Sequence, residues 1–93
     1  MNATLEKEQK NLPIEVYPNP VKAGEFITID TKKSYIENAQ VLLFDLCGRE
    51  LNVTPISNNL GAFKWLIPLV PSGIYFIKVK TEKSEYVQKI VVQ

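Results

Sequence analysis

Apolar and polar residues alternate along several short stretches of the chain, as they do in β-strands that bury one face and expose the other. The alternation is clearest in segments 63–67 and 75–79, and segment 41–46 is the strongest apolar run. Seven segments have the character of short strands: 14–17, 26–29, 41–46, 51–53, 63–67, 75–79 and 86–92. No segment shows a convincing long amphipathic helical pattern. We therefore predict an all-β protein of about seven short strands.

Residues that favour turns separate these segments at regular intervals. Pro18 and Pro20 end the first strand, because proline lacks the N–H that a β-ladder needs. Gly48 suits the left-handed position of a tight hairpin. Further breaks are expected at Pro55, at a turn cluster in 57–61, at Pro68, at 71–73 and at a charged turn in 81–85. Strands with this spacing indicate an antiparallel sandwich or barrel whose last two strands form a hairpin.

The distribution of apolar residues divides the chain into two parts. Residues 1–13 are mostly polar, and we interpret them as a flexible linker or tail. Residues 14–93 hold all the candidate strands and form one domain, since 93 residues leave no room for two. Hydrophobic residues make up 45% of the chain and charged residues 23%, as in an ordinary folded protein. Such a domain has one modest core and no room for a deep pocket beside it.

Charge and apolar-run length argue against two classes of partner. Eleven basic and ten acidic residues give a formal net charge of +1 without a basic stripe, so we expect no nucleic-acid binding. The apolar runs are far shorter than the roughly 20 residues that a membrane-spanning helix needs, so no transmembrane segment is expected. Residues 1–11 do not resemble a secretion signal; for an exported protein, that signal would lie upstream.

The side chains of most catalytic and metal sites are missing. The chain has no histidine, which removes the usual general base and the commonest zinc ligand. The single cysteine, Cys47, has no base partner and cannot close an internal disulfide. Two aspartates, Asp30 and Asp45, do not make a calcium-binding loop, and the four glycines lie in separate turns. We predict that the protein is not an enzyme and has no cofactor.

Three local patterns occur together in a fixed order. They are Tyr17-Pro18-Asn19-Pro20 with Gly24, Phe44-Asp45-Leu46-Cys47-Gly48-Arg49, and Pro71-Ser72-Gly73-Ile74-Tyr75 followed by Lys89 before Ile90-Val91-Val92. In this order the chain resembles the type A C-terminal sorting domain of the type IX (Por) secretion system of Bacteroidetes, over about residues 14–93. It departs from the commonest pattern at Cys47, a position that is more often small and polar, and in the last hairpin turn, which lacks the usual glycine.

The resemblance implies an immunoglobulin-like β-sandwich at the C-terminus of a larger secreted cargo protein. It implies recognition by the outer-membrane type IX translocation machinery and removal by a cell-surface sortase, with a cut near the linker before Ile14. The cargo would then be released or attached to the surface. The expected location is the periplasm in transit, and then the cell surface or the medium.

Nine motif positions are candidates for recognition or for a structural role: Pro18, Asn19, Pro20, Asp45, Gly48, Arg49, Gly73, Tyr75 and Lys89. The structural reading favours a strand end at the two prolines, a turn stabilised by Asp45, and a lysine that guards a strand edge. The functional reading is that hairpin 73–93 presents a strand edge and a lysine-bearing face to the machinery, for example by β-augmentation.

An alternative is an immunoglobulin-like binding or spacer module of a secreted protein, for carbohydrate or adhesion. Phe63 and Trp65 would then form a sugar-stacking platform, although their alternation favours burial in the core. Two or more coplanar exposed rings would support a binding module. A smooth sandwich with an open strand edge near the C-terminus would support a sorting domain.

Overall fold

The computed structural model describes residues 14–82 and 84–93, in which five strands form and no helix. The strands are β1 (Glu15–Tyr17), β2 (Phe26–Asp45), β3 (Glu50–Leu66), β4 (Gly73–Lys80) and β5 (Glu85–Val92). Every pairing between these strands is antiparallel. The segment expected as a linker, 1–13, lies outside the described residues.

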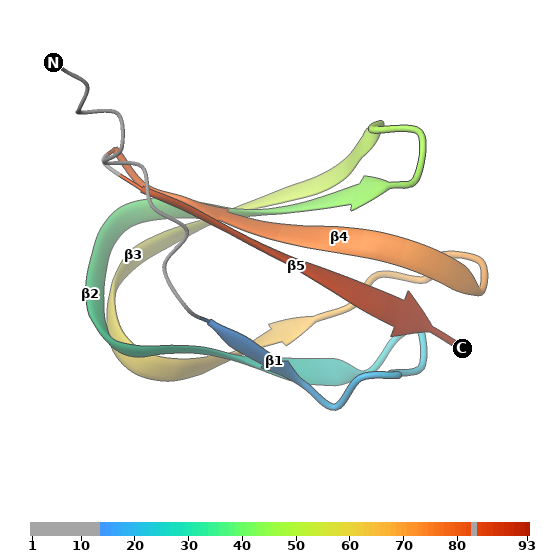
Figure 1. Cartoon of the computed structure of the whole chain (residues 1–93), viewed down its shortest axis with the longest axis horizontal. Helices are drawn as coiled ribbons and strands as arrows, with labels where there is room; N and C mark the ends of the chain where they lie inside the picture. Colours follow the sequence, from blue (N-terminus) through green and yellow to red (C-terminus); the bar gives the residue numbers. More distant parts are fainter. Residues whose placement is uncertain (1–13, 83) are drawn as a thin grey trace, which may run out of the picture.

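Two long strands build both layers of the molecule. Strands β2 and β3 run side by side and curve together at the left of Figure 1. Before the bend, β2 lies between β1 and β3; after it, β2 lies between β3 and β4, and β4 continues the sheet to β5. The result is a sandwich of a three-stranded and a four-stranded sheet, which confirms the predicted all-β fold. The expected seven segments are all present, four of them joined in pairs.

The continuity of β3 corrects two predictions. Residues 57–61 were expected to form a turn and Pro55 to break its strand, but β3 runs through both, and its pairs with β2 include Gln40↔Pro55 and Glu37↔Asn58. A register shift between the Asp30 and Tyr35 pairs accompanies the bend. Asn38 has a φ of 53° and Gly61 a φ of 90°, which are left-handed values that asparagine and glycine tolerate best. Turn-favouring residues here bend a continuous hairpin instead of ending its strands.

The core lies between the two layers, where inward-facing residues of both sheets meet. The fully buried apolar side chains are Ile27, Ile29, Val41, Leu43, Ile67, Ile77, Val79, Ile90 and Val92. Trp65 belongs to the same cluster and is also buried. The alternation that predicted strand 75–79 therefore matches a buried and an outer face of β4, with Tyr75, Ile77 and Val79 on the buried face.

Candidate functional site

The three sequence motifs gather at one end of the sandwich. Asp45, at the end of β2, pairs with Tyr75 of β4, and Gly73 pairs with Val92 of β5. The loop that follows β1 reaches the end of β5 through Asn19. This is the right-hand end in Figure 1, where the C-terminus also lies. Motifs that are separated by up to about 70 positions in the chain thus form one surface.

Asn19 fastens the last strand with its side-chain amide. Its Nδ2 donates a hydrogen bond to the carbonyl oxygen of Lys89 at 3.1 Å, and its Oδ1 accepts one from the N–H of Val91 at 2.9 Å. The neighbouring Pro18 and Pro20 have no N–H to offer. The amide of Asn19 therefore provides the donor and acceptor that a paired strand would otherwise provide.

Val21 continues this edge with its backbone. Its N–H donates to Val91 O at 2.9 Å, and its carbonyl oxygen accepts from the N–H of Gln93 at 2.8 Å. A parallel bridge joins Val21 to Val92, and the Val21 side chain is buried in the core. The edge of β5 that was expected to stay open is thus occupied along residues 89–93. Val21 was not predicted as a site residue, although an apolar side chain directly after Pro20 in an otherwise mostly polar loop is a signal that could have indicated it.

The turn between β2 and β3 is organised by the carboxylate of Asp45. Oδ1 accepts hydrogen bonds from the N–H groups of Cys47 and Arg49, each at 2.9 Å, and Oδ2 accepts one from Arg49 Nε at 3.1 Å. The backbone closes the same turn from Asp45 N to Arg49 O at 3.1 Å, and Gly48 has the expected left-handed φ of 84°. Asp45 and Arg49 therefore stabilise a tight hairpin, and the Arg49 side chain stays largely exposed.

We expect this turn to loosen in acid. The backbone N–H of Arg49 is the main group that holds the pKa of Asp45 below its ordinary value of 3.8, helped by the N–H of Cys47 and by the Arg49 side chain. Because the folded-state pKa is depressed, the stabilisation is complete above the unfolded-state pKa and is lost as the pH falls through the folded-state pKa.

An NMR titration of the Cys47 and Arg49 amide signals measures this directly, with an expected midpoint below 3.8. Asp45→Asn is the control, because it removes the ionisable group and should flatten the titration. A midpoint at or above the ordinary value would contradict the assignment.

Tyr75 ties the start of β4 to the preceding loop. Its hydroxyl donates a hydrogen bond to the carbonyl oxygen of Pro71 at 2.6 Å, and its ring is buried. Gly73 begins β4, and a Cβ placed on it would only touch the Tyr75 ring at 3.8 Å. These two positions fix the path of the chain into the last hairpin.

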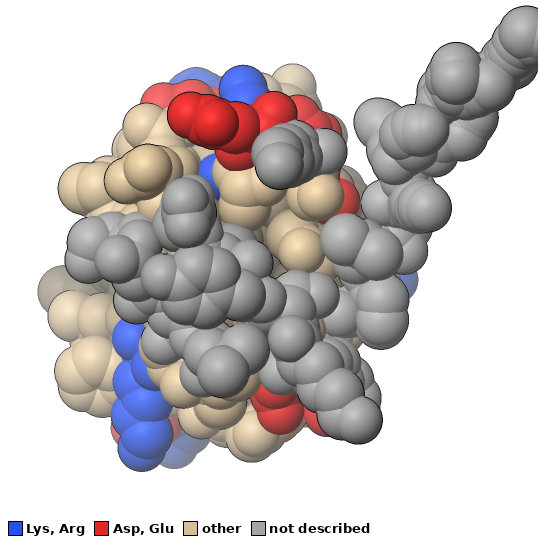
Figure 2. Space-filling view, turned by 90° about the vertical axis from the view of Figure 1, so that its left-hand side faces the viewer, with Lys and Arg blue, Asp and Glu red and all other residues tan. Residues whose placement is uncertain are grey.

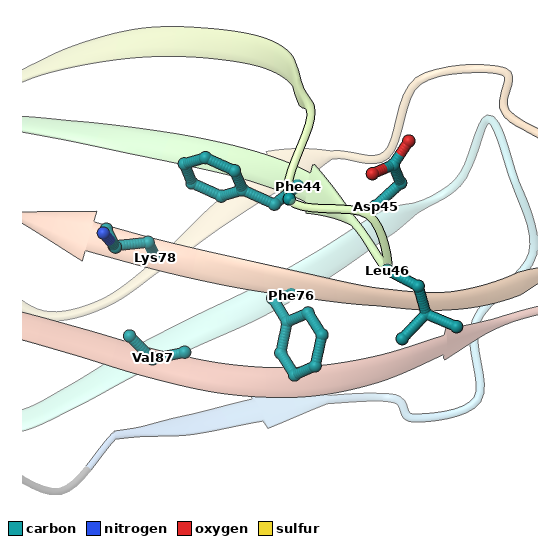
Figure 3. A pocket seen from close by; sticks show the side chains of 7 residues that line it. Phe44, Asp45, Leu46, Phe76, Lys78 and Val87 are labelled. Atoms are coloured by element: carbon teal, nitrogen blue, oxygen red, sulfur yellow. The ribbon is translucent and has the colours of Figure 1, made fainter.

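The outer face beside the Asp45 turn carries an open hollow of about 310 Å³ (Figure 3). It is lined by Phe44, Asp45, Leu46, Gly48, Phe76, Lys78 and Val87. The Lys78 ammonium lies 5.3 Å from the centroid of the Phe44 ring and 3.6 Å from the Glu85 carboxylate. This surface offers apolar contact with a cationic edge, and the exposed Lys89 side chain lies on the same sheet.

The face shown in Figure 2 carries both acidic and basic side chains, with acidic groups at the upper rim beside basic ones. Within residues 14–82 and 84–93, no group of histidine, cysteine, aspartate or glutamate side chains is placed to hold a metal ion. None of the described residues forms a helix long and apolar enough to cross a membrane.

Phe63 and Trp65 do not form the exposed aromatic platform that the alternative interpretation required of them. Trp65 is buried, and Phe63 is half-buried against the core. The described rings that are exposed, Tyr17 and Phe26, belong to β1 and β2 of the same three-stranded sheet as Phe63 and Trp65. The interpretation of Phe63 and Trp65 as core residues is the one that fits the structure.

These observations define a small antiparallel β-sandwich. Its motif residues lie in hydrogen-bonded turns and in the final strand. Residues 15–93 match the family described as a secretion system C-terminal sorting domain, and the chain belongs to that family. The domain is a sorting signal for type IX secretion. Domains of this family are not catalytic in themselves. No curated protein matches the chain. Membership implies attachment to a cargo, interaction with the type IX machinery, and export toward the cell surface or into the medium.

Proposed function

We propose that residues 14–93 form a non-catalytic signal domain that directs a larger cargo polypeptide, joined to its N-terminal side, across the outer membrane by type IX secretion. The observation that carries this proposal is the family match over residues 15–93. The gathering of all three motifs at one end of the sandwich supports it, because a partner that docks there contacts them together.

Residues 1–13 serve in this proposal as the linker in which a surface sortase cuts. The position of the first strand supports such a role. Because β1 begins at Glu15, a cut before Ile14 leaves every described strand in the sandwich. The cargo is then released or attached to the cell surface without unfolding of the signal domain.

The recognition surface in this proposal is the motif-bearing end, with the Asp45 turn, the start of β4 and the outer side chains of β5. The side chains of Arg49 and Lys89 support this role, since both are exposed there. Pro18, Asn19, Pro20, Gly48, Gly73 and Tyr75 act by fixing the backbone of that surface.

A secretion assay tests the proposal. Residues 1–93 are fused to the C-terminus of a periplasmically exported fluorescent protein, in a host with a working type IX system and in one without it. We expect fluorescence at the surface or in the medium only in the first host, and a mass-spectrometric cut site within residues 1–13. Fluorescence held in the periplasm of both hosts would overturn the proposal.

A further inference from the structure

An antiparallel sandwich that does not close into a barrel keeps strand edges, where backbone N–H and C=O groups face outward and accept another strand. In the described part of the chain, the outermost strands are β1, β3 and β5. Two of these edges are already obstructed. Asn19 and Val21 occupy β5 along residues 89–93, and the three-residue β1 contacts β5 on the same side of the sandwich. The edge that remains open on β5 is short, from residue 85 to residue 88, and the longest edge is that of β3.

The first half of β3 is interrupted by Pro55. The backbone of Val91 faces the Asn19 loop, so alternate residues of β5 face outward, Glu85 among them. Glu85 pairs with Lys80 of β4, Lys80 with Gln40 of β2, and Gln40 with Pro55 of β3. Because the backbone of Glu85 points away from β4, the backbone of Lys80 points toward β2, that of Gln40 toward β4, and that of Pro55 away from β2, at the outer edge. Proline has no N–H, so a partner strand loses a hydrogen bond there. This half of the edge is guarded against pairing.

The second half of β3, residues 56–66, contains no proline. The N–H of Ile67 donates to Glu25 O at 3.0 Å, and Ile67 O accepts from the N–H of Gly24 at 2.9 Å, so the backbone of Ile67 faces the β2 side. Backbone direction alternates along a strand, and this end of the β2–β3 ladder has no register shift. The residues whose backbone groups point outward are therefore Ala62, Lys64 and Leu66. No hydrogen bond from a described backbone group reaches the outward N–H and C=O groups of these three residues.

We propose that the outer edge of β3 at residues 62–66 is a strand-docking site for an extended segment of another protein, one that places an acidic residue opposite Lys64 and an apolar residue opposite Leu66. The backbone groups of Ala62, Lys64 and Leu66 supply the hydrogen bonds of an added strand. This inference deepens the proposed function, on which it rests, by naming an edge through which a component of the secretion machinery binds.

The side chains next to this edge set the chemistry of the partner. Lys64 and Leu66 are exposed on the outer face of the three-stranded sheet, and Leu66 pairs with Phe26. Leu66 is 47% exposed and Phe26 57%, so an apolar side chain on an added strand covers surface that is otherwise in water. Lys64 favours a carboxylate directly opposite on the added strand. If two copies of this edge paired around residue 64, the two Lys64 side chains would face each other, and their like charges would disfavour the pairing.

The test replaces outward-facing residues of β3 by proline in the fluorescent fusion, in a host with the type IX system. Lys64→Pro removes an outward N–H without touching the ladder to β2, and natural Pro55 shows that β3 accepts proline at such a position. Lys64→Thr keeps the backbone N–H and replaces the long charged side chain by a short neutral one that suits a strand. Val53→Pro is the matched control, because its backbone faces outward on the half of the edge that Pro55 already interrupts. Folding of each purified variant is followed by the fluorescence of Trp65.

We expect the secreted share to fall about tenfold for Lys64→Pro, as for a loss of roughly 1.4 kcal/mol in binding. Lys64→Thr should fall only a few-fold, and Val53→Pro should match the natural sequence. Normal secretion of folded Lys64→Pro would overturn the docking site while leaving the proposed function intact. If Lys64→Pro fails to fold, Ala62→Pro takes its place with the same expectation.

Retention of the fusion with the natural sequence in the periplasm would instead count against the proposed function.

Sedimentation of the purified chain tests whether a second copy of the chain occupies the β3 edge. A dimer that becomes a monomer in Lys64→Pro would assign the edge to a second copy and overturn the partner named here. A monomer in both is the expected result.

Discussion

Replacing Ile77 by alanine is expected to lower the free energy of unfolding by about 2–5 kcal/mol, the usual cost of deleting a fully buried isoleucine side chain. Ile77 lies in the middle of β4, is fully buried and belongs to the core cluster. The total stability of a domain this size is only about 5–15 kcal/mol. The substitution therefore removes a large part of it, and cargo fused to this variant should be retained in the periplasm.

Urea unfolding followed by the fluorescence of Trp65, the single tryptophan of the chain, measures the effect. Val87→Ala is the matched control, because Val87 is an apolar residue of β5 that is 56% exposed. We expect the control to shift the unfolding free energy by less than about 0.5 kcal/mol. Equal unfolding midpoints for the two variants would show that the core does not lie where the structure places it.

The second large effect is expected at Asn19. Asn19→Ala removes two hydrogen bonds to β5, one to Lys89 O and one from Val91 N. Two such bonds contribute about 1–3 kcal/mol in total. The loss should appear first as local opening of the end of β5, because Val91 N–H and Lys89 O lose their side-chain partner while the β4–β5 ladder remains.

Native-state hydrogen exchange measures this opening at the Val91 amide, with an expected loss of protection of about tenfold or more. Gln88→Ala is a close control, because Gln88 Nε2 also donates to Lys89 O at 3.1 Å but makes no bond to Val91. Asn19→Asp should fall between the two, since its carboxylate still accepts from Val91 N–H but cannot donate to Lys89 O. Unchanged exchange at Val91 in Asn19→Ala would rule out the fastening role.

The strands could be predicted from the sequence because a half-buried strand alternates apolar and polar residues over a few positions. The alternation around Ile77 predicted both the strand and its buried face, and Gly48 after Asp45 predicted the hairpin that the structure confirms. The three short motifs pointed to the family that the match over residues 15–93 confirms. Each of these inferences depends on residues within a few positions of one another.

What could not be predicted depends on residues far apart. Asn19 reads as part of a strand end, and nothing nearby indicates that its amide bonds to residues 70 and 72 positions later. Gly61 reads as a turn residue, but its left-handed φ serves a bend inside a paired strand, because the partner strand β2 bends with it. The role of a turn-favouring residue was thus decided by its long-range pairing and not by its own preference.

The fastening of Val21 to β5 also has a consequence for the timing of folding. Chains dominated by pairings between distant residues fold slowly, on the order of milliseconds to seconds. Here the loop after β1 finds its hydrogen-bonding partners, Val91 and Gln93, only when β5 is present. A polypeptide cut short before β5 leaves β4 with an unpaired edge and the buried Val21 without its partners. The folded sandwich therefore reports that translation has run to the end of β5, and a signal that acts in this form distinguishes finished cargo from truncated cargo.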